Sequence, residues 1–373
     1  MKKILFTLLG LCFFSAAAFA APVIFETASG RTVWQIMEQA EIAFEKGELG
    51  ESLALAENAR IRHTESVQHV ISLINNALGS REVQRAGDDI NLVYAVLQTR
   101  NETEVTDALD AVFLKYPARS FSNSMKNLSD WLQKRLVYPE ADMLVARIYE
   151  AEGEYPLALS FYESAWQNRD FLDIPETKFR IAYSMADISY NMGNYGAREK
   201  YLLLVLMDDP VFGQPGNESG ILRAMMRTVQ TEKNIDKFFL LYRHSNINAL
   251  KAYQDLTSFY LYDSEKRLDR AFPVAVLAAC VSLTAMTEAI KLVDPEYVYT
   301  NFADAMDRSG RNYRISEWIA REKILDSFLL LASVLSERGE IEQARSIWST
   351  LMIYCAEKTV AEKAAGELGI ILN

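Results

Sequence analysis

The chain has 373 residues, of which 50% are hydrophobic and 24% are charged, so it carries enough apolar material for a large core. Its 9 Pro and 16 Gly are too few for a disordered or an all-β chain, and its formal net charge of −11 disfavours nucleic acid and anionic lipid as partners. A basic partner would fit this charge, but solubility explains it equally well.

Residues 1–20 predict a secretory signal peptide of the short bacterial type. They combine a lysine-containing start, an apolar run over 4–14 and a small-x-small site at Ala18-Phe19-Ala20. We expect cleavage after Ala20, which leaves a periplasmic chain without a transmembrane segment. Its net charge would be −13, because two lysines and no acid are removed.

Two alternatives to a cleaved signal come from the same residues. The apolar stretch reaches Ala21, so the segment could remain as an uncleaved anchor, although its short core and Ala-rich end favour removal. A lipoprotein would need a small residue immediately before Cys12, and Leu11 stands there.

Four stretches of the chain share a pattern of small and large apolar residues around a glycine. The best formed runs from Ala146 to Ala165, with small residues where two helices would approach and aromatics where space must be filled. The pattern predicts two short helices joined by a turn at the glycine. The matching residues in chain order are Ala40, Ala43, Gly47, Leu49, Ser52, Ala56 and Ala59; Ala146, Tyr149, Gly153, Tyr155, Ala158, Tyr162 and Ala165; Ala186, Gly193, Tyr195 and Pro210; and Ala332, Leu335, Gly339, Ile341, Ala344, Trp348 and Leu351.

This spacing resembles the tetratricopeptide repeat family. The third stretch departs from the family pattern, with Ser189 where the family has Tyr and Arg198 where it has Ala. The resemblance implies an all-α fold over 21–373, a right-handed α-solenoid of helix-turn-helix repeats, several of them degenerate. It also makes a binding scaffold the leading function.

The spacing of the turn glycines suggests that the array fills the chain. The glycines at 47, 153, 193 and 339 are separated by 106, 40 and 146 residues, or roughly three, one and four repeats of about 34 residues. About nine or ten helix pairs would then follow one another, with residues 107–117 as half of a degenerate pair. The alternative is a break between two shorter arrays near 210–220, where Pro and Gly cluster.

One apolar region could be taken for a membrane-spanning helix, and the two cysteines in apolar runs could be taken for a disulfide. Residues 271–286 carry no charge, but they are too short for a spanning helix and contain Pro273, so we expect a helix buried between neighbours. Cys280 and Cys355 remain after signal cleavage, in apolar runs typical of free buried cysteines. A disulfide between them is the alternative in an oxidising compartment.

The sequence offers little catalytic chemistry, and we expect neither an enzyme, a cofactor nor a metal site. The spacing of His63 and His69 does not place them on one helical face as metal ligands. No phosphate-binding loop, G-x-S-x-G or C-x-x-C motif is present. Four Glu-Ser pairs resemble that of lytic transglycosylases, but none is followed by Gly-Leu-Met-Gln: Glu51-Ser52, Glu65-Ser66, Glu163-Ser164 and Glu218-Ser219.

The resemblance implies that a partner binds on the concave side of the solenoid, which the first helix of each pair lines. In the pair around Gly193 the residues of this stripe share one helical face and mix aromatic and charged groups. The alternative is that the tyrosines only pack and that the charges are solvated. The candidate partner-binding residues are Arg147, Glu150, Arg180, Tyr183, Asp187, Tyr190 and Asn191.

One type of ligand is disfavoured by the residues at these positions. Repeats that clamp a C-terminal carboxylate use Lys and Asn there, whereas this chain has Met37 and Glu41, Met143 and Arg147, and Tyr183 and Asp187. An extended segment or a folded partner is therefore expected.

From the sequence we expect a non-catalytic adaptor that binds an envelope or periplasmic protein. We also expect residues 362–372 to form a final polar helix that closes the array. A ligand-binding component for a small apolar or organic solute, associated with a transport system, is the alternative function. Its basis is a run of aromatics over 238–262 that exceeds the needs of one helix pair, although core filling also explains most of them.

Overall fold

A computed structural model describes residues 32–79, 130–207, 209–214, 217–232, 234–262 and 266–369, together with 83–85, 119–120 and a few isolated positions. The described residues are almost entirely helical, which confirms the all-α class. The predicted signal peptide and most of 107–117 lie outside the described residues. The chain divides into two compact units, unit 1 (Met1–Asn194) and unit 2 (Tyr195–Asn373).

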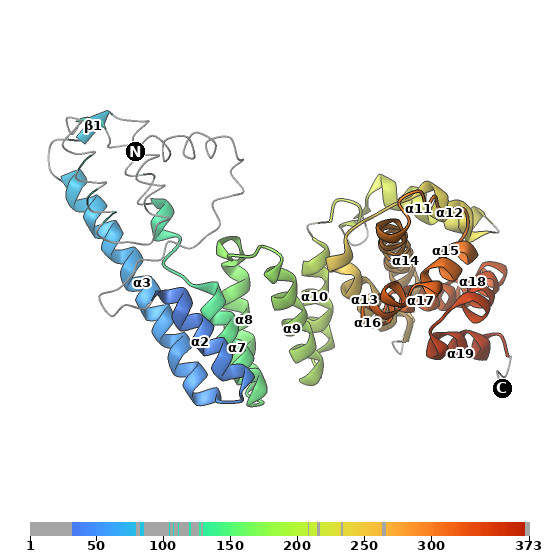
Figure 1. Cartoon of the computed structure of the whole chain (residues 1–373), viewed down its shortest axis with the longest axis horizontal. Coiled ribbons are helices and arrows are strands. Elements are labelled where there is room, and N and C mark those ends of the chain that lie inside the picture. The colour runs from blue at the N-terminus through green and yellow to red at the C-terminus, as the bar shows by residue number, and fades with distance from the viewer. Residues whose placement is uncertain are drawn as a thin grey trace. The chain divides into compact units, whose positions relative to one another are not determined.

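Unit 1 is built mainly from helices that each contact the next described helix, although residues 80–138 separate α3 from α7 in the chain. The pairs α2 and α3, α3 and α7, α7 and α8, and α8 and α9 each pack together (Figure 1). Two short parallel strands, β1 and β2, accompany them. The elements are α2 (Val33–Glu45), α3 (Leu49–Gly79), β1 (Val83–Arg85), β2 (Arg119–Ser120), α7 (Pro139–Ala151), α8 (Tyr155–Gln167), η1 (Arg169–Phe171) and α9 (Thr177–Asn191).

Each of the four predicted turn glycines ends a helix in the same way. After α7, the N–H of Gly153 donates to the carbonyl of Glu150 at 3.1 Å and the N–H of Glu154 donates to that of Tyr149 at 2.8 Å. This Schellman pair requires a left-handed residue, and Gly153 has φ +80. The same two bonds form at Gly47, Gly193 and Gly339, so the predicted helix-turn-helix connections are present at all four positions.

The small residues of the pattern lie where the helices of unit 1 meet. Ala40, Ala56 and Ala59 are fully buried in a core shared by α2, α3 and α7. Small side chains let helix backbones approach closely, and the Ser52 hydroxyl donates to the Ala40 carbonyl across the α2–α3 contact at 2.7 Å. The packing role predicted for these residues is confirmed.

Helix α3 is longer than the short second helix that the repeat pattern predicts. It runs for 31 residues, whereas α8 runs for 13. No Gly or Pro occurs between Gly50 and Gly79, so no residue breaks the helix within that span.

Unit 2 is organised around the long helix α14, which contacts α11, α13, α15, α16 and α17 (Figure 1). This differs from a repeat array, in which each unit contacts only its neighbours. The elements are α10 (Tyr195–Leu206), β3 (Gly213–Gln214), β4 (Asn217–Glu218), α11 (Gly220–Thr231), α12 (Ile235–Leu241), η2 (Ile247–Ala249), α13 (Leu250–Tyr262), α14 (Leu268–Val293), α15 (Phe302–Arg311), α16 (Tyr313–Arg321), α17 (Asp326–Glu337), α18 (Ile341–Tyr354) and α19 (Lys358–Glu367). The segment 210–220 contains the antiparallel β3–β4 hairpin.

Helix α14 is buried, as expected from its apolar sequence. It is the one helix among the described residues that is long and apolar enough to cross a membrane, and 83% of its most apolar stretch is buried inside the protein. Its few polar groups have partners within the unit, such as the Ser282 hydroxyl, which donates to Ser327 Oγ at 2.9 Å. These features are typical of a core helix.

The aromatic residues of α12 fill the core of unit 2. Phe239 contacts the rings of Phe302 and Phe328 with centroids 5.4 and 5.8 Å away, and Phe238 is fully buried beside it. Tyr253 is also fully buried, on α13. Core filling therefore accounts for these members of the aromatic run.

Candidate functional site

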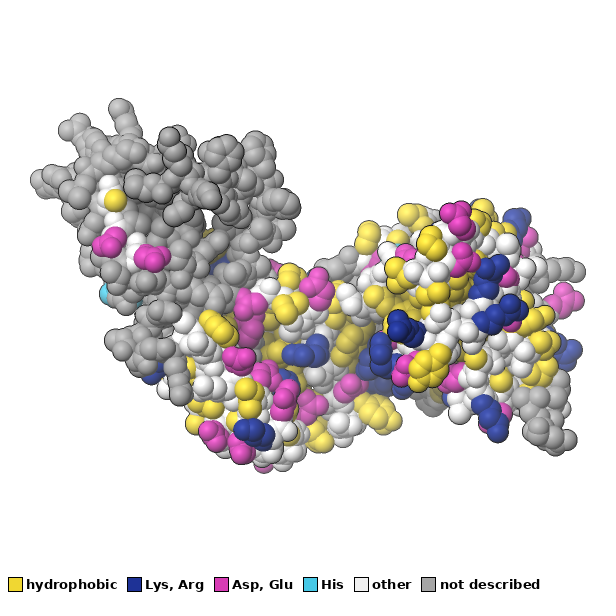
Figure 2. Space-filling view, viewed as in Figure 1, with side chains coloured by type: hydrophobic (Ala, Val, Ile, Leu, Met, Phe, Trp, Pro, Cys, Tyr) yellow, Lys and Arg dark blue, Asp and Glu magenta, His cyan; other side chains and the backbone are white. Residues whose placement is uncertain are grey.

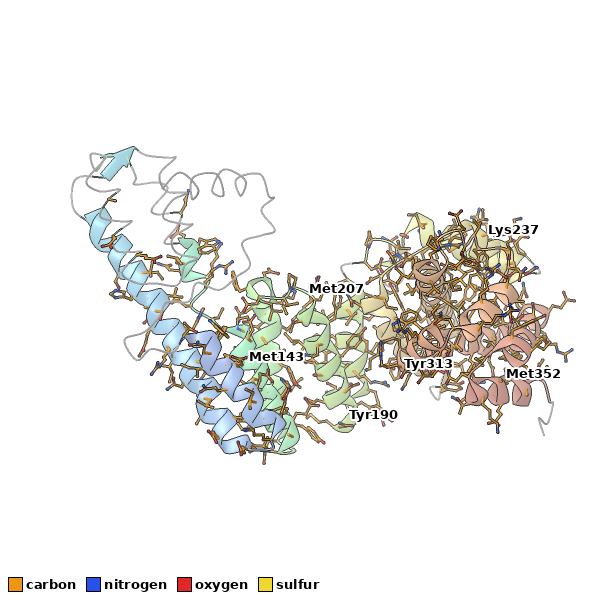
Figure 3. All side chains as sticks on the ribbon, in the orientation of Figure 1. Met143, Tyr190, Met207, Lys237, Tyr313 and Met352 are labelled. Carbon is orange, nitrogen blue, oxygen red and sulfur yellow. The ribbon has the colours of Figure 1, made fainter. Side chains whose placement is uncertain are left out.

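A cavity of about 350 Å³ opens in unit 1 among α2, α7, α8 and α9. Figure 3 labels Met143, one of its residues, on α7. On the face shown in Figure 2, acidic side chains gather over the helices of unit 1. The cavity is lined by Phe44, Met143, Arg147, Glu150, Ala151, Tyr162, Arg180 and Ser184.

Helical spacing brings the α7 residues of the cavity together. Met143, Arg147 and Glu150 follow one another at intervals of four and three, which places them on one face of α7. The same interval of four separates Arg180 from Ser184 on α9. Arg180 contacts Met143, so these faces of the two helices lie against the same space.

Arg147 is neutralised by a carboxylate from the preceding helix. Its Nη1 donates to both carboxylate oxygens of Glu41, at 2.8 and 2.6 Å, and its guanidinium lies over the Phe44 ring at 4.4 Å. Both charges are partly exposed, so we expect the pair to orient Arg147 more than it stabilises the fold. Arg147 and Phe44 therefore give the cavity a flat surface without net charge.

Glu150 and Tyr162 form the opposite end of the cavity. The Tyr162 hydroxyl donates to Glu150 Oε2 at 2.8 Å, and the tyrosine ring is buried. Burial raises the pKa of Tyr162 and the Glu150 carboxylate raises it further, while a hydrogen bond with Ser184 acts in the other direction. Tyr162 is therefore a permanent donor, which fixes Glu150 as an acceptor.

Arg180 differs from Arg147 because it has no carboxylate partner among the described residues. Its polar contact is with Met143 Sδ, 3.4 Å from Nη2, and the residue is exposed. A thioether is a weak acceptor, so the guanidinium keeps most of its capacity to bind an anion.

The structure brings together three of the seven predicted partner-binding residues. Arg147, Glu150 and Arg180 line the cavity. The other four lie on α9 outside the cavity lining: Tyr183, which is half-buried, and Asp187, Tyr190 and Asn191, which are exposed. Figure 3 shows Tyr190 near the end of α9.

Five of the eight lining residues were not among the predicted partner-binding residues: Phe44, Met143, Ala151, Tyr162 and Ser184. Phe44 comes from α2, where only Met37 and Glu41 were considered as positions on the binding face. Tyr162 was predicted only as a packing residue, and its ring is buried as expected, but its hydroxyl reaches the cavity. The signal available was that Tyr, unlike Phe, brings a hydroxyl that needs a partner.

A second polar cluster in unit 1 surrounds Glu140 at the start of α7. Its Oε1 accepts from the backbone N–H of Asp173 at 2.6 Å, while its Oε2 is buried with no hydrogen-bond partner. Burial and the nearby Asp173 carboxylate raise the pKa of Glu140 to about 7, against the smaller opposing effects of the Asp173 N–H and Arg135. Glu140 thus links the α8–α9 connection to α7. Because its pKa is raised, keeping it ionised in the folded protein costs stability at high pH.

Unit 2 contains a buried carboxylate with more partners. Asp209 Oδ2 accepts from His244 Nε2 at 2.6 Å, from Asn246 at 2.8 Å and from the Tyr253 hydroxyl at 2.5 Å. Burial alone would raise the pKa of Asp209, but these hydrogen bonds outweigh it and hold that pKa well below its usual range. The cluster fastens the segment after α10 to the connection between α12 and α13.

The described parts of the chain contain few side chains arranged for metal binding or for covalent catalysis. No group of three His, Cys, Asp or Glu side chains is arranged there to hold a metal ion. His63 is buried, bonds through Nε2 to the Arg135 carbonyl at 2.8 Å, and has its pKa lowered by burial. Cys280 and Cys355 are free thiols.

The serines of three Glu-Ser pairs have structural hydrogen bonds. Ser52 joins α2 to α3, and Ser164 donates to Asp142 Oδ2 at 2.7 Å. Ser219 caps α11 by accepting from the Leu222 N–H at 3.0 Å. These contacts explain the serines without a role in glycan chemistry.

A comparison with known proteins found a relative that matches most of the chain. No model of a known protein family matches the sequence. An uncharacterized protein of Treponema pallidum (strain Nichols) is 34% identical over 343 residues, which is 92% of this chain and 91% of that protein. The chain belongs to the same family as this protein. The match covers 343 of the 373 residues, so it includes most of both units.

Proposed function

We propose that the protein is a non-catalytic scaffold of the bacterial envelope, in which tetratricopeptide-like helix pairs hold a segment of a partner protein in the cavity of unit 1. The observation that carries this proposal is the origin of the cavity lining. Apart from Tyr162, every lining residue comes from α2, α7 or α9, the helices that end at Gly47, Gly153 and Gly193. In a tetratricopeptide solenoid the corresponding first helices line the binding face.

The chemistry of the cavity supports binding of a peptide segment. It combines aromatic and thioether surface from Phe44 and Met143 with a cation at Arg180 and an anion at Glu150. Aromatic, Met and Arg side chains are enriched at protein interfaces, where a few anchors supply most of the affinity.

Export to the periplasm is the second part of the proposal and is supported by sequence. Residues 1–20 have the features of a cleavable signal, and the family relative comes from a bacterium. N-terminal sequencing of the protein recovered from a periplasmic fraction should begin at Ala21. Recovery of the chain from the cytoplasm with Met1 intact would contradict this part.

Co-purification from the envelope tests the scaffold function. The wild-type chain and the Arg180→Gln variant would be purified in parallel, and co-purified proteins quantified by mass spectrometry. We expect a partner whose recovery falls at least severalfold with Arg180→Gln. Arg314→Gln is the matched control, because Arg314 is also an exposed helical arginine and has no ion pair among the described residues. A set of proteins equally recovered with all three chains would contradict the proposal.

A second candidate function, binding of a small apolar solute, is favoured by a cavity in unit 2. This cavity has a volume of about 370 Å³ and a mostly apolar wall, and Met207, one of its residues, is labelled in Figure 3. The apolar lining includes Leu203, Leu204, Met207 and Phe212, and the charged lining residues are Glu199 and Lys200. Native mass spectrometry of the exported chain would reveal a bound solute of defined mass. Loss of that species in Leu203→Glu, together with no protein partner, would favour this function over the scaffold.

A further inference from the structure

We propose that the cavity of unit 1 selects an extended segment with an acidic side chain at one end and a basic side chain three residues away. This inference rests on the scaffold function and adds the charge pattern of the partner. It follows from three features of the cavity: an arginine available at one end, a neutralised arginine in the middle and a carboxylate available at the other end.

The positive end of the cavity is formed by Arg180. Its side chain is beside Met143 at 3.4 Å, and no carboxylate pairs with it among the described residues. Because the guanidinium presents several N–H donors in a fixed plane, it can hold a carboxylate by two parallel hydrogen bonds. An acidic side chain of the segment would therefore lie at this end, against the apolar surface of Met143.

The middle of the cavity does not add a second positive charge. Arg147 already donates to both oxygens of Glu41, so its charge is balanced before any ligand arrives. Its guanidinium and the Phe44 ring are stacked and present flat surfaces. This wall suits small apolar or ring-shaped side chains between the two charged residues of the segment.

The negative end is formed by Glu150. Tyr162 occupies Oε2, and the other carboxylate oxygen has no partner in the described part of the chain. The remaining carboxylate oxygen of Glu150 is therefore where a Lys or Arg of the segment would bind.

The distance between the two ends sets the spacing of the ligand's charges. Met143 and Glu150 are seven residues apart on α7, which corresponds to about 10 Å along a helix. A polyproline II helix has three residues per turn and rises about 3.1 Å per residue, so side chains on one face lie about 9 Å apart. An acid and a base at positions i and i+3 of such a segment would reach both ends together.

Peptide binding to the full mature chain tests this inference. The probe is a fluorescently labelled, acetylated and amidated peptide, Ala-Asp-Pro-Pro-Lys-Ala, and two comparison peptides replace Asp by Asn or Lys by Gln. Fluorescence anisotropy would be measured up to millimolar protein or competitor concentrations. We expect each replacement to weaken binding to the wild type by about two- to fivefold, the range of a partly exposed ion pair.

The variants assign each effect to its end of the cavity. With Arg180→Gln the Asp-to-Asn replacement should have no effect, and with Glu150→Gln the Lys-to-Gln replacement should have none. The amide oxygen introduced by Glu150→Gln would still accept from the Tyr162 hydroxyl, so the local fold is kept, and thermal melting would verify this. Arg314→Gln and Glu288→Gln, at exposed helical positions of unit 2, should behave as the wild type.

Two outcomes separate this inference from the scaffold function. Equal binding of the three peptides, absence of binding, or charge effects that persist in the two variants would overturn the inference. If a partner still co-purifies in a manner that depends on Arg180, the scaffold function stands while the charge pattern fails. If no partner depends on the cavity, the scaffold function fails as well.

Discussion

Unit 1 and unit 2 are both helical but assemble their cores in different ways. In unit 1 each described helix from α2 to α9 packs largely on the next one, and small residues are buried where α2, α3 and α7 meet. Glycine turns join α2 to α3 and α7 to α8. In unit 2 one apolar helix, α14, contacts five other helices. Unit 1 thus depends on a repeated local geometry, whereas unit 2 depends on a single buried element.

Buried polar atoms without a hydrogen-bond partner occur in both units, for example Glu340 Oε2 and Trp348 Nε1 in unit 2, but the polar clusters described above differ in how completely they are paired. The cavity of unit 1 leaves Arg180 and one oxygen of Glu150 available, and Glu140 has a buried oxygen without a partner. In unit 2, Asp209 is held by three side chains. Incompletely paired groups cost stability and are characteristic of functional sites, whereas fully paired ones stabilise a fold.

The largest expected effect comes from a charge placed in α14. Ala278→Asp would bury an unpaired carboxylate at a fully buried position, which costs about 3–5 kcal/mol. Hydrogen exchange followed by mass spectrometry should show loss of protection throughout α13, α14 and α17. Ala224→Asp, at an exposed position of α11, is the control and should change stability by less than about 1 kcal/mol. Retained protection of α14 in Ala278→Asp would contradict its central role.

Removal of the charge at Asp209 should have the next largest effect. Asp209→Asn weakens the hydrogen bonds from His244, Asn246 and Tyr253, with an expected loss of about 2–4 kcal/mol in the free energy of unfolding at pH 7. Because the folded-state pKa is lowered, the stabilisation by Asp209 is present above pH ~4 and declines as the pH falls below it.

Urea unfolding at pH 7 and pH 3.5 would measure this difference. The gap between wild type and Asp209→Asn should narrow at the lower pH. Asp269→Asn, which alters an exposed acid in the first turn of α14, should cost less than about 1 kcal/mol. An equal effect of the two substitutions would mean that the cluster is not a special source of stability.

A smaller loss is expected at the glycine turns of unit 1. Gly153→Ala has room for the methyl group, so its cost of about 1 kcal/mol comes from the left-handed backbone alone. Gly50→Ala, in the first turn of helix α3 with ordinary backbone angles and free space, should instead stabilise by less than about 1 kcal/mol. Thermal unfolding of both variants measures the two changes in stability. If both substitutions stabilised or both destabilised the protein, the left-handed turn conformation would not explain the effect at Gly153.

The smallest effect concerns Glu140 and is expected only at high pH. Since burial raises its pKa to about 7, its contribution to stability is present below pH ~4.5 and is lost as the pH rises through 7. Glu140→Gln keeps an oxygen acceptor for the Asp173 N–H and removes the charge. We expect the variant to be more stable than wild type at pH 8, by on the order of 1 kcal/mol, and to lose this advantage near pH 5. Melting curves that differ equally at both pH values would contradict the assignment.

The glycine turns were predictable because a left-handed helix end favours glycine. Unit 2 shows the limit of this signal. After α16 the N–H of Ile324 donates to the Ile319 carbonyl and that of Lys323 to the Ala320 carbonyl, which is the same turn. Here the left-handed residue is Lys323, with φ +53, and because it is not a glycine the sequence did not indicate the turn.

The apolar sequence predicted that α14 is buried, but not which helices surround it. Its contacts with α11 and α17 join segments far apart in the chain, and no local periodicity specifies such pairs. The same limit applies to the end of the chain. The final helix was expected over 362–372, whereas α19 spans Lys358–Glu367.

The residues of the candidate site that share a helical face could be predicted from sequence spacing, whereas those brought in by tertiary packing could not. Arg147, Glu150 and Arg180 were identified because each lies on the expected face of its helix. Tyr162 and Phe44 reach the cavity through tertiary packing, which places an α8 hydroxyl and an α2 ring beside them. Neither position can be inferred from the spacing within one helix.

Photo-crosslinking in intact cells tests the central claim most directly. A photoreactive amino acid at position 184 would lie in the cavity, and one at position 313 would lie at an exposed site of unit 2. We predict one predominant protein adduct from position 184 that is absent from position 313, is lost with Arg180→Gln and is retained with Arg314→Gln. An adduct that forms equally from both positions, or that is unaffected by Arg180→Gln, would contradict a partner bound in the cavity of unit 1.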